Sequence, residues 1–317
     1  MKVMMRDRFG SADVLRLAEI EPPRISGDEV LVRVHASTVS IGDWFWLTGT
    51  PLMMRPASGL LRPRDRVLGR DVAGVVTAVG ADVRDMHIGD EVYGEIPFGA
   101  HAEYVAAPAR LLARKPANLT FEQAAAVPLA GGTALQGLRD AGRLRAGQHV
   151  LVNGASGAVG TFAVQIAKAF GAEVSAVCSG PNAELVRSLG ADHVIDYAHE
   201  DFTRGDARYD LIFDLVGSRP IGACRRVLTP TGVYVASTSK LRVLLRAALM
   251  SIVARGRVVV LVARGSKADL DALRELIEAG RVTPVIDGSY SLSQVPEAFR
   301  QQGLGHARGR KVITIAA

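Results

Sequence analysis

The sequence contains little cysteine and few aromatic residues. Cys178 and Cys224 are its only cysteines, too few for a disulfide framework or a cysteine-ligated metal cluster. Aromatic residues make up 5% of the chain, and the net charge is +6. No block of five or more Lys and Arg residues is interleaved with aromatics, so the positive charge does not indicate a nucleic-acid surface. A phosphorylated cofactor bound in a basic cleft explains it more simply.

Long apolar runs are also missing. Residues 241–254 include Arg242 and Arg246, so this segment is too short and too charged to cross a bilayer. We expect it to form a helix that packs on a sheet or against a second subunit. The alternative is a basic amphipathic helix on a membrane surface. Because residues 1–15 lack the apolar core of a signal peptide, the sequence predicts a cytoplasmic protein.

The clearest pattern present is a strand, a glycine-rich turn, a helix and a second strand. Residues 148–152 have an apolar core and a bias toward β-branched residues, as in a buried strand. They are followed by a GxxGxxG turn at 154–160 and by an apolar repeat of helical spacing that ends at Gly171. A second strand is predicted at 173–178. This βαβ context is the one in which such glycines bind a dinucleotide.

The turn supplies the first candidate cofactor residues. One glycine makes the tight turn, another lets backbone amides approach a pyrophosphate, and a third lets helix and strand touch. The first turn of the helix then directs its unpaired N–H groups at the phosphates. The residues assigned to this role are Gly154, Ala155, Ser156, Gly157, Ala158 and Val159.

Two different regions precede and follow Phe121. The first is β-rich, with short strands predicted at 29–35, 72–79 and 102–106 between Gly- and Pro-rich turns, which indicates a compact barrel-like domain. After Phe121, two helices separated by a break at 128–132 lead into alternating strands and helices, which predict a parallel doubly wound sheet. Further strands are predicted at 193–196, 209–216, 232–236 and 257–263. We therefore expect an α/β protein with one domain at 1–122, completed by 284–317, and a second at 123–283.

Several segments together resemble a known family over nearly the whole chain. They include VLGRDVAGVVTAVG at 67–80, AAAVPLAGGTALQGL at 124–138, NGASGAVG at 153–160 and GHARGRKV at 305–312. The chain resembles the zinc-free, quinone-oxidoreductase-like branch of the medium-chain dehydrogenase/reductase superfamily. The resemblance implies a GroES-like substrate domain, a Rossmann domain, a cofactor in the cleft between them, and a homodimer.

The resemblance also bears on metal binding. Zinc-dependent relatives have a cysteine where this chain has Ser40, and a His-Glu pair where it has Arg70 and Asp71. Neither Ser40 nor Arg70 is a credible zinc ligand, and no two of the seven histidines lie at a metal-ligand spacing. We expect no metal. Without a Lewis acid, reduction of a quinone or an activated double bond is favoured over simple alcohol oxidation.

The cofactor is predicted to be NADPH. The second strand ends at Ser179 without the carboxylate that an NAD site places on the ribose hydroxyl, and Ser179 can donate to a 2′-phosphate. The resemblance adds Tyr197 and Val216 as cofactor contacts. Close relatives often carry an arginine where this chain has Pro181, so the cation must come from elsewhere. Lys311 is assigned this role, with Arg308 and Arg310 as open alternatives.

The resemblance places Ser40, Asp43 and Thr133 near the nicotinamide, as candidate catalytic residues. The structural alternatives are that Asp43 caps the turn before residues 44–46 and that Thr133 starts a helix as its N-cap. The predicted function is NADPH-dependent reduction of quinones or α,β-unsaturated carbonyl compounds. Two alternatives stay open at this point, a zinc-free carbonyl or alcohol dehydrogenase and a cofactor-binding protein without turnover.

Overall fold

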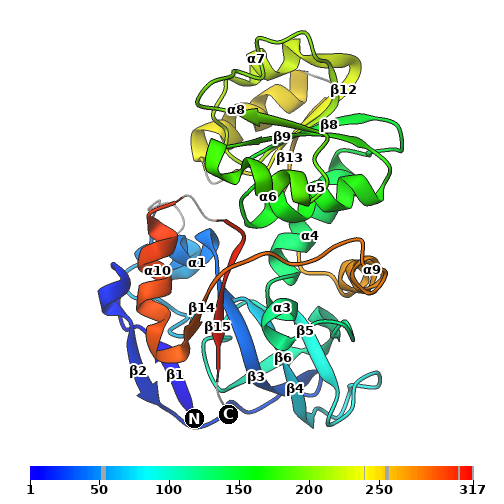
Figure 1. The fold of residues 1–317 in the computed structure, drawn as a ribbon. Coiled ribbons are helices and arrows are strands. Elements are labelled where there is room, and N and C mark those ends of the chain that lie inside the picture. The colour runs from blue at the N-terminus through cyan, green and yellow to red at the C-terminus, as the bar shows by residue number, and fades with distance from the viewer. Residues whose placement is uncertain (51–54, 239, 254–256, 306–307, 316–317) are drawn as a thin grey trace. The chain divides into compact units, whose positions relative to one another are not determined.

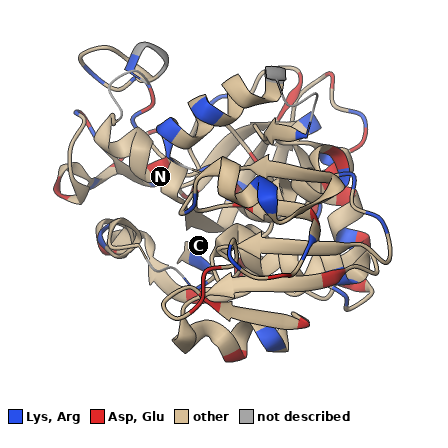
Figure 2. Cartoon of the chain, turned by 90° about the horizontal axis from the view of Figure 1, so that it is seen from above, with Lys and Arg blue, Asp and Glu red and all other residues tan. Residues whose placement is uncertain are grey.

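The computed structural model describes residues 1–50, 55–238, 240–253, 257–305 and 308–315, and the chain divides into two compact units (Figure 1). Unit 1 comprises Met1–Leu129, Gly265–Glu275 and Pro284–Ala317, and unit 2 comprises Ala130–Arg264 and Leu276–Thr283. The observed division falls at 129/130 rather than at the expected 122/123. It also gives residues 265–275 to the first unit, although they lie inside the expected second domain. Lys and Arg residues are interspersed with Asp and Glu along the ribbon (Figure 2).

Unit 1 is built on a sheet of order β14-β15-β3-β4-β5-β7, with β6 paired to β3. β3 runs to Val39, beyond the expected 29–35, and alternates buried and partly buried residues up to His35. Val32 on β3 packs in the core of the unit, which also contains Leu68 and Phe299. β1 and β2 form a separate antiparallel pair. The strand bounds are β1 (Lys2–Met5), β2 (Arg16–Glu19), β3 (Glu29–Val39), β4 (Asp71–Val79), β5 (Glu91–Glu95), β6 (Tyr104–Pro108), β7 (Leu112–Arg114), β14 (Ile286–Ser291) and β15 (Arg310–Thr314).

Short helices cover the sheet of unit 1. α1 and α10 pack side by side (Figure 1), and α3 packs on β3 and β4. The bounds are α1 (Ile41–Thr48), α2 (Arg55–Ser58), α3 (Phe121–Ala125) and α10 (Val295–Gly303), with 3-10 turns at Ala12–Val14, Ala109–Leu111 and Leu292–Gln294. α9 (Lys267–Glu278) contributes its first turns to unit 1 and its last residues to unit 2.

Unit 2 contains a parallel sheet of order β10-β9-β8-β11-β12-β13. This is the order of a doubly wound Rossmann fold, in which the strand sequence reverses between β8 and β11. The strand bounds are β8 (His149–Asn153), β9 (Glu173–Cys178), β10 (His193–Asp196), β11 (Tyr209–Asp214), β12 (Leu228–Ala236) and β13 (Val258–Val260). The predicted fold class, a Rossmann sheet with a β-rich domain, is confirmed.

Helices lie on both faces of this sheet, with α5 and α6 on one side and α7 and α8 on the other (Figure 1). The bounds are α4 (Pro128–Gln136), α5 (Ala158–Ala169), α6 (Ala183–Ser188), α7 (Ile221–Arg226) and α8 (Leu241–Val253), with a 3-10 turn at Gly180–Asn182. α8 packs on β12 and β13 and buries Ala247, as expected for residues 241–253. Ala254 lies outside the described residues. None of the helices in the described ranges has the length and apolar character needed to cross a membrane.

One expectation about the helices is wrong. The sequence predicts a break between two helices at 128–132 and Thr133 as a possible start of the second. The break lies instead at 126–127, and α4 begins at Pro128 and continues through both glycines to Gln136. Proline is well suited to the first position of a helix, where its missing N–H has no helical partner. Thr133 therefore lies inside α4 and is not its N-cap. A π-helical turn, Gly137–Ala141, follows α4 directly.

Candidate functional site

The glycine-rich turn of unit 2 has the geometry of a phosphate cradle. Gly154 follows β8 with φ +92°, a conformation that glycine adopts without strain. A Cβ on Gly160 would lie 2.1 Å from the carbonyl oxygen of Gly154, so the third glycine is required for the turn to pack on α5. A Cβ on Gly157 would meet only that oxygen, at 3.4 Å. The open space at Gly157, beside the first N–H groups of α5, suits a pyrophosphate.

A buried carboxylate holds the neighbouring loop. Asp214, at the end of β11, is fully buried and accepts hydrogen bonds from Asn153 Nδ2, the Val216 and Gly217 N–H groups and Tyr234 Oη, at 2.6–3.0 Å. Burial, and after it the charge of Asp214, raises the pKa of Tyr234, so its hydroxyl stays a donor. This network sets Val216 against the turn, because a Cβ on Gly154 would lie 2.7 Å from Val216 Cγ2. Gly154 and Val216, which are both predicted to contact the cofactor, are therefore neighbours.

The end of β9 gathers further polar groups. Asn182 Nδ2 donates to Ser179 Oγ and to Ser156 Oγ, at 3.2 Å in each case. These bonds bring together two residues that the sequence assigns to the cofactor. Tyr197 follows β10 and is 50% exposed, so its hydroxyl is accessible.

The sequence argument missed a carboxylate at this place. Asp196 Oδ2 lies beside the backbone of Gly180, where an added Cβ would be 2.7 Å away. The N–H of Ala198, 3.0 Å from Asp196 Oδ1, is the main cause of a lowered pKa for this carboxyl group. The charge comes from β10, the strand next to β9 in the sheet, so inspection of the end of β9 alone could not find it. A register argument between parallel strands, Asp196 with Cys178, could have done so.

The basic residues near the C-terminus lie in unit 1. Lys311 Nζ is 2.6 Å from Asp287 Oδ2, with 6% of the lysine side chain exposed. Arg310 is buried and paired with Asp71, whereas Arg308 is exposed. A cofactor contact by Lys311 would therefore have to compete with its ion pair to Asp287.

A buried ionic cluster of unit 1 includes Asp71, one of the residues compared above with the ligands of zinc-dependent relatives. Arg310 Nη2 donates to Asp71 Oδ2 and to Thr38 Oγ1. Thr38 Oγ1 donates in turn to Asp71 Oδ2 at 2.5 Å, and the Leu129 N–H donates to Asp71 Oδ1 at 2.8 Å. Burial lowers the pKa of Arg310 to about 10, which still leaves it protonated at neutral pH. Both oxygens of Asp71 are thus occupied.

Ser40 and Asp43 form a capping box at the start of α1. Ser40 Oγ donates to Asp43 Oδ2 at 2.6 Å, the Ser40 N–H donates to the same oxygen at 2.9 Å, and the Asp43 N–H donates back to Ser40 Oγ at 3.1 Å. The capping alternative for Asp43 is confirmed. Three nearby buried atoms have no hydrogen-bond partner among the residues described, namely Asp43 Oδ1, His101 Nδ1 and Arg310 Nε.

This donor set does not fit a catalytic zinc. Arg70 Nη2 is bonded to Glu95 Oε1 at 2.5 Å, so Arg70 and Asp71 belong to two separate ion pairs rather than to one. The hydroxyl of Ser40 is bonded to Asp43, and the charge of Asp71 is matched by Arg310. A zinc site needs three neutral or anionic ligands and an open position, and a cation at Arg70 would repel the metal.

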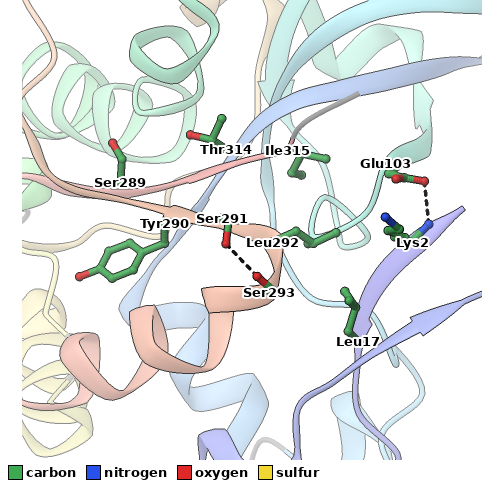
Figure 3. Close-up of a pocket in the computed structure, with 10 residues that line it drawn as sticks. All are labelled: Lys2, Leu17, Glu103, Ser289, Tyr290, Ser291, Leu292, Ser293, Thr314 and Ile315. Atoms are coloured by element: carbon green, nitrogen blue, oxygen red, sulfur yellow. Dashed lines mark hydrogen bonds between the residues drawn. The ribbon is translucent and has the colours of Figure 1, made fainter.

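A groove of about 410 Å³ lies elsewhere in unit 1 (Figure 3). It is lined by Tyr290 near the end of β14, by Leu292 in the 3-10 turn that follows, by Thr314 on β15 and by Lys2 on β1. None of the candidate residues lines it, so we do not include it in the site.

Known proteins share both parts of this arrangement. Residues 26–117 match the family model described as the alcohol dehydrogenase GroES-like domain, and residues 189–313 match the one described as zinc-binding dehydrogenase. The chain is 36% identical to 2-methylene-furan-3-one reductase of Solanum lycopersicum, over 99% of this chain and 79% of that protein. It belongs to the medium-chain dehydrogenase/reductase superfamily.

Two further members of the superfamily support this assignment. The NADPH-dependent alkenal/one oxidoreductase of Arabidopsis thaliana, a chloroplastic protein, is 35% identical over 99% of this chain and 79% of its own length. The structure of the quinone oxidoreductase from Coxiella burnetii superposes with a TM-score of 0.89 at 30% identity, covering 100% of this chain and 99% of that one. The resemblance seen in the sequence is confirmed. This chain is an NAD(P)H-dependent oxidoreductase of the superfamily.

Proposed function

We propose that the protein uses NADPH to reduce quinones or α,β-unsaturated carbonyl compounds, and that it does so without zinc. The observation that carries the zinc-free assignment is the buried pair of Asp71 and Arg310, with Arg70 held by Glu95. By the family resemblance, Arg70 and Asp71 stand where zinc-dependent relatives have a His-Glu pair. The names of the tomato, Arabidopsis and Coxiella relatives support the substrate class.

In this proposal unit 2 binds the cofactor. The backbone N–H groups at Ala158 and Val159 hold the pyrophosphate, and Gly157 leaves the space for its approach. Val216, fixed by the bond of its N–H to Asp214, packs beside it. Ser179 and Tyr197 donate to the ribose phosphate. The bound nicotinamide supplies the hydride, so the protein's contribution is orientation and exclusion of water.

Ser40, Asp43 and Thr133 are proposed to act near the nicotinamide by positioning. Because the hydroxyl of Ser40 is bonded to Asp43, we assign this pair to fixing the first turn of α1 rather than to proton transfer. The side chain of Thr133 projects from the middle of α4 and is 9% exposed. Substitution of Ser40 by alanine should then change KM more than kcat.

The test of the function is turnover by chelator-treated protein. We expect NADPH oxidation with an enone and with a quinone after removal of metals, at the rate of the untreated protein. Saturated alcohols and simple ketones should give little or no turnover, which separates this proposal from a carbonyl or alcohol dehydrogenase. Activity that is lost on chelation and restored by zinc would contradict the proposed mechanism. Tight NADPH binding without any turnover would instead favour a binding protein.

The preference for NADPH is expected to depend on Ser179. Asp196 already places a carboxylate near Gly180, so a second one in Ser179→Asp should repel the 2′-phosphate. A charge-assisted hydrogen bond contributes about 1.5–3 kcal/mol, so its loss should lower kcat/KM for NADPH by roughly one to two decades. The value for NADH should change far less. Steady-state kinetics with both cofactors measure this.

Ser188→Asp is the matched control, since Ser188 is an exposed residue of α6 and the substitution adds the same charge. It should keep the cofactor ratio of the parent. A parent protein that prefers NADH outright would refute the NADPH assignment.

We also propose a homodimer, which the family resemblance implies, and a cytoplasmic location. Sedimentation analysis tests the first, and cell fractionation tests the second.

A further inference from the structure

Three metal-binding side chains meet at the amino end of the sheet in unit 2. His149, Glu173 and His193 are the first residues of β8, β9 and β10, which are adjacent parallel strands. The register pairs His149 with Glu173 and His193 with Ser175. In a parallel sheet all strands have their amino ends on one side of the sheet and their carboxyl ends on the opposite side. This cluster is therefore remote from the glycine-rich turn, which follows the carboxyl end of β8.

The three side chains converge closely. One ligand atom from each lies within 4.8 Å of the other two. His193 Nε2 is 2.7 Å from Glu173 Oε1, and the rings of His149 and His193 have centroids 5.8 Å apart. The side chains of His193 and Glu173 are 56% and 51% exposed, so the cluster is open to ions from solvent.

We propose that His149, Glu173 and His193 form a binding site for a divalent transition-metal ion such as Zn²⁺. Two imidazoles and one carboxylate are an established ligand set for zinc, with water in the fourth position. Zinc takes its nitrogen and oxygen ligands at about 2.0–2.2 Å, and small side-chain rotations bring atoms within 4.8 Å of one another into that range. Binding replaces the hydrogen bond between His193 and Glu173.

The local structure prepares the least mobile ligand. His149 packs its ring edge-on against Tyr209, with centroids 4.8 Å apart. Its Nε2 lies 2.8 Å from Ser175 Oγ, and an ion bound through this nitrogen replaces that contact. Its N–H donates to Asp210 at 3.0 Å, which fixes the backbone at the start of β8. The two other ligands are exposed and can adjust to the ion. A bound ion would then link three neighbouring strands and stabilise unit 2.

Few other groups in the described part of the chain compete for the ion. No other cluster of three His, Cys, Asp or Glu ligands was found there. Both cysteines are buried, at 2% and 0% exposure. His199 with Asp196 and His87 with Asp90 offer two ligands each. The histidines of the cluster are distant in sequence, and for that reason spacing along the chain did not predict the site.

The test is a zinc titration of metal-free, full-length protein in competition with a chromophoric chelator. We expect one Zn²⁺ per chain in the parent. His193→Ala and Glu173→Gln should each weaken the affinity by more than about tenfold, because even outer groups of metal sites change affinity that much. Both residues are exposed, so these variants should fold. His87→Ala removes an exposed histidine of unit 1 and should bind zinc as the parent does.

Two further readouts identify the ligands. Bound Co²⁺ should give visible absorption bands in the parent that are lost in both variants, and Zn²⁺ should raise the melting temperature of the parent but of neither variant. The proposal is wrong if the parent binds no zinc even when zinc is present in molar excess over protein. It is also wrong if both variants bind zinc as the parent does. Reductase activity should be the same with and without added zinc, so a failure of this site does not affect the proposed function. Zinc that restores activity would place the metal elsewhere.

Discussion

Gly157→Val should abolish NADPH binding and leave the protein folded. Gly157 has φ −76°, which valine tolerates, and its added Cβ would meet no protein atom closer than 3.4 Å. The branched side chain then fills the space in which the backbone approaches the pyrophosphate. We expect no fluorescence-detected NADPH binding, together with a circular dichroism spectrum and a melting temperature close to those of the parent.

Gly160→Val is the contrasting variant, since its Cβ would lie 2.1 Å from the Gly154 carbonyl oxygen and 2.7 Å from the backbone of Ala155. It should lose the fold as well as the cofactor, whereas Gly132→Ala, with nothing within 4 Å of the new Cβ, should lose neither. NADPH affinity unchanged in Gly157→Val would mean that the pyrophosphate binds elsewhere. If Gly157→Val unfolds, the turn does not have room for a branched side chain at this position, although the geometry indicates that it does.

The sequence predicted most accurately the features that depend on neighbouring residues. The strand at Glu173–Cys178 and the strand at His193–Asp196 have the bounds expected from periodicity, because an apolar run between turn residues is a local signal. The turn at 154–160 was found in the same way. The break at 128–132 was a wrong prediction, since proline at the start of a helix and proline after its end look alike in sequence.

Long-range pairs account for most of what the sequence could not show. Asp71 meets Arg310 across 239 residues, and no periodicity relates two such positions. Asp196 reaches Gly180 only because β9 and β10 are adjacent and in register. His149 and His193 likewise meet only because β8 and β10 lie on either side of β9 in the sheet. The residue types were informative in each case, but their partners depend on strand order, which is a property of the folded sheet.

Arg310→Met should cause a large loss of stability. Arg310 and Asp71 are 2% and 1% exposed, so removal of the arginine leaves a carboxylate buried without its countercharge. Breaking such a pair from one side costs about 3–5 kcal/mol, a large part of the stability of an ordinary domain. We expect urea denaturation to show a loss of this size in the free energy of unfolding. Arg300→Met removes an exposed pair with Asp13 and should leave the denaturation midpoint near that of the parent.

The double variant Asp71→Asn/Arg310→Met separates loss of the charge pair from loss of packing. Its asparagine keeps an oxygen for the Leu129 N–H and gains a donor for Thr38 Oγ1, so the backbone contact and the hydroxyl contact both survive. Because a neutral replacement of a buried pair is often close to neutral in stability, the double variant should recover most of what Arg310→Met loses. If the double variant is as unstable as the single one, the guanidinium acts through its shape and its contact with Thr38 rather than through its charge. If Arg310→Met itself costs nothing, Asp71 is protonated in the folded protein and the ionic cluster is not the element that replaces a metal.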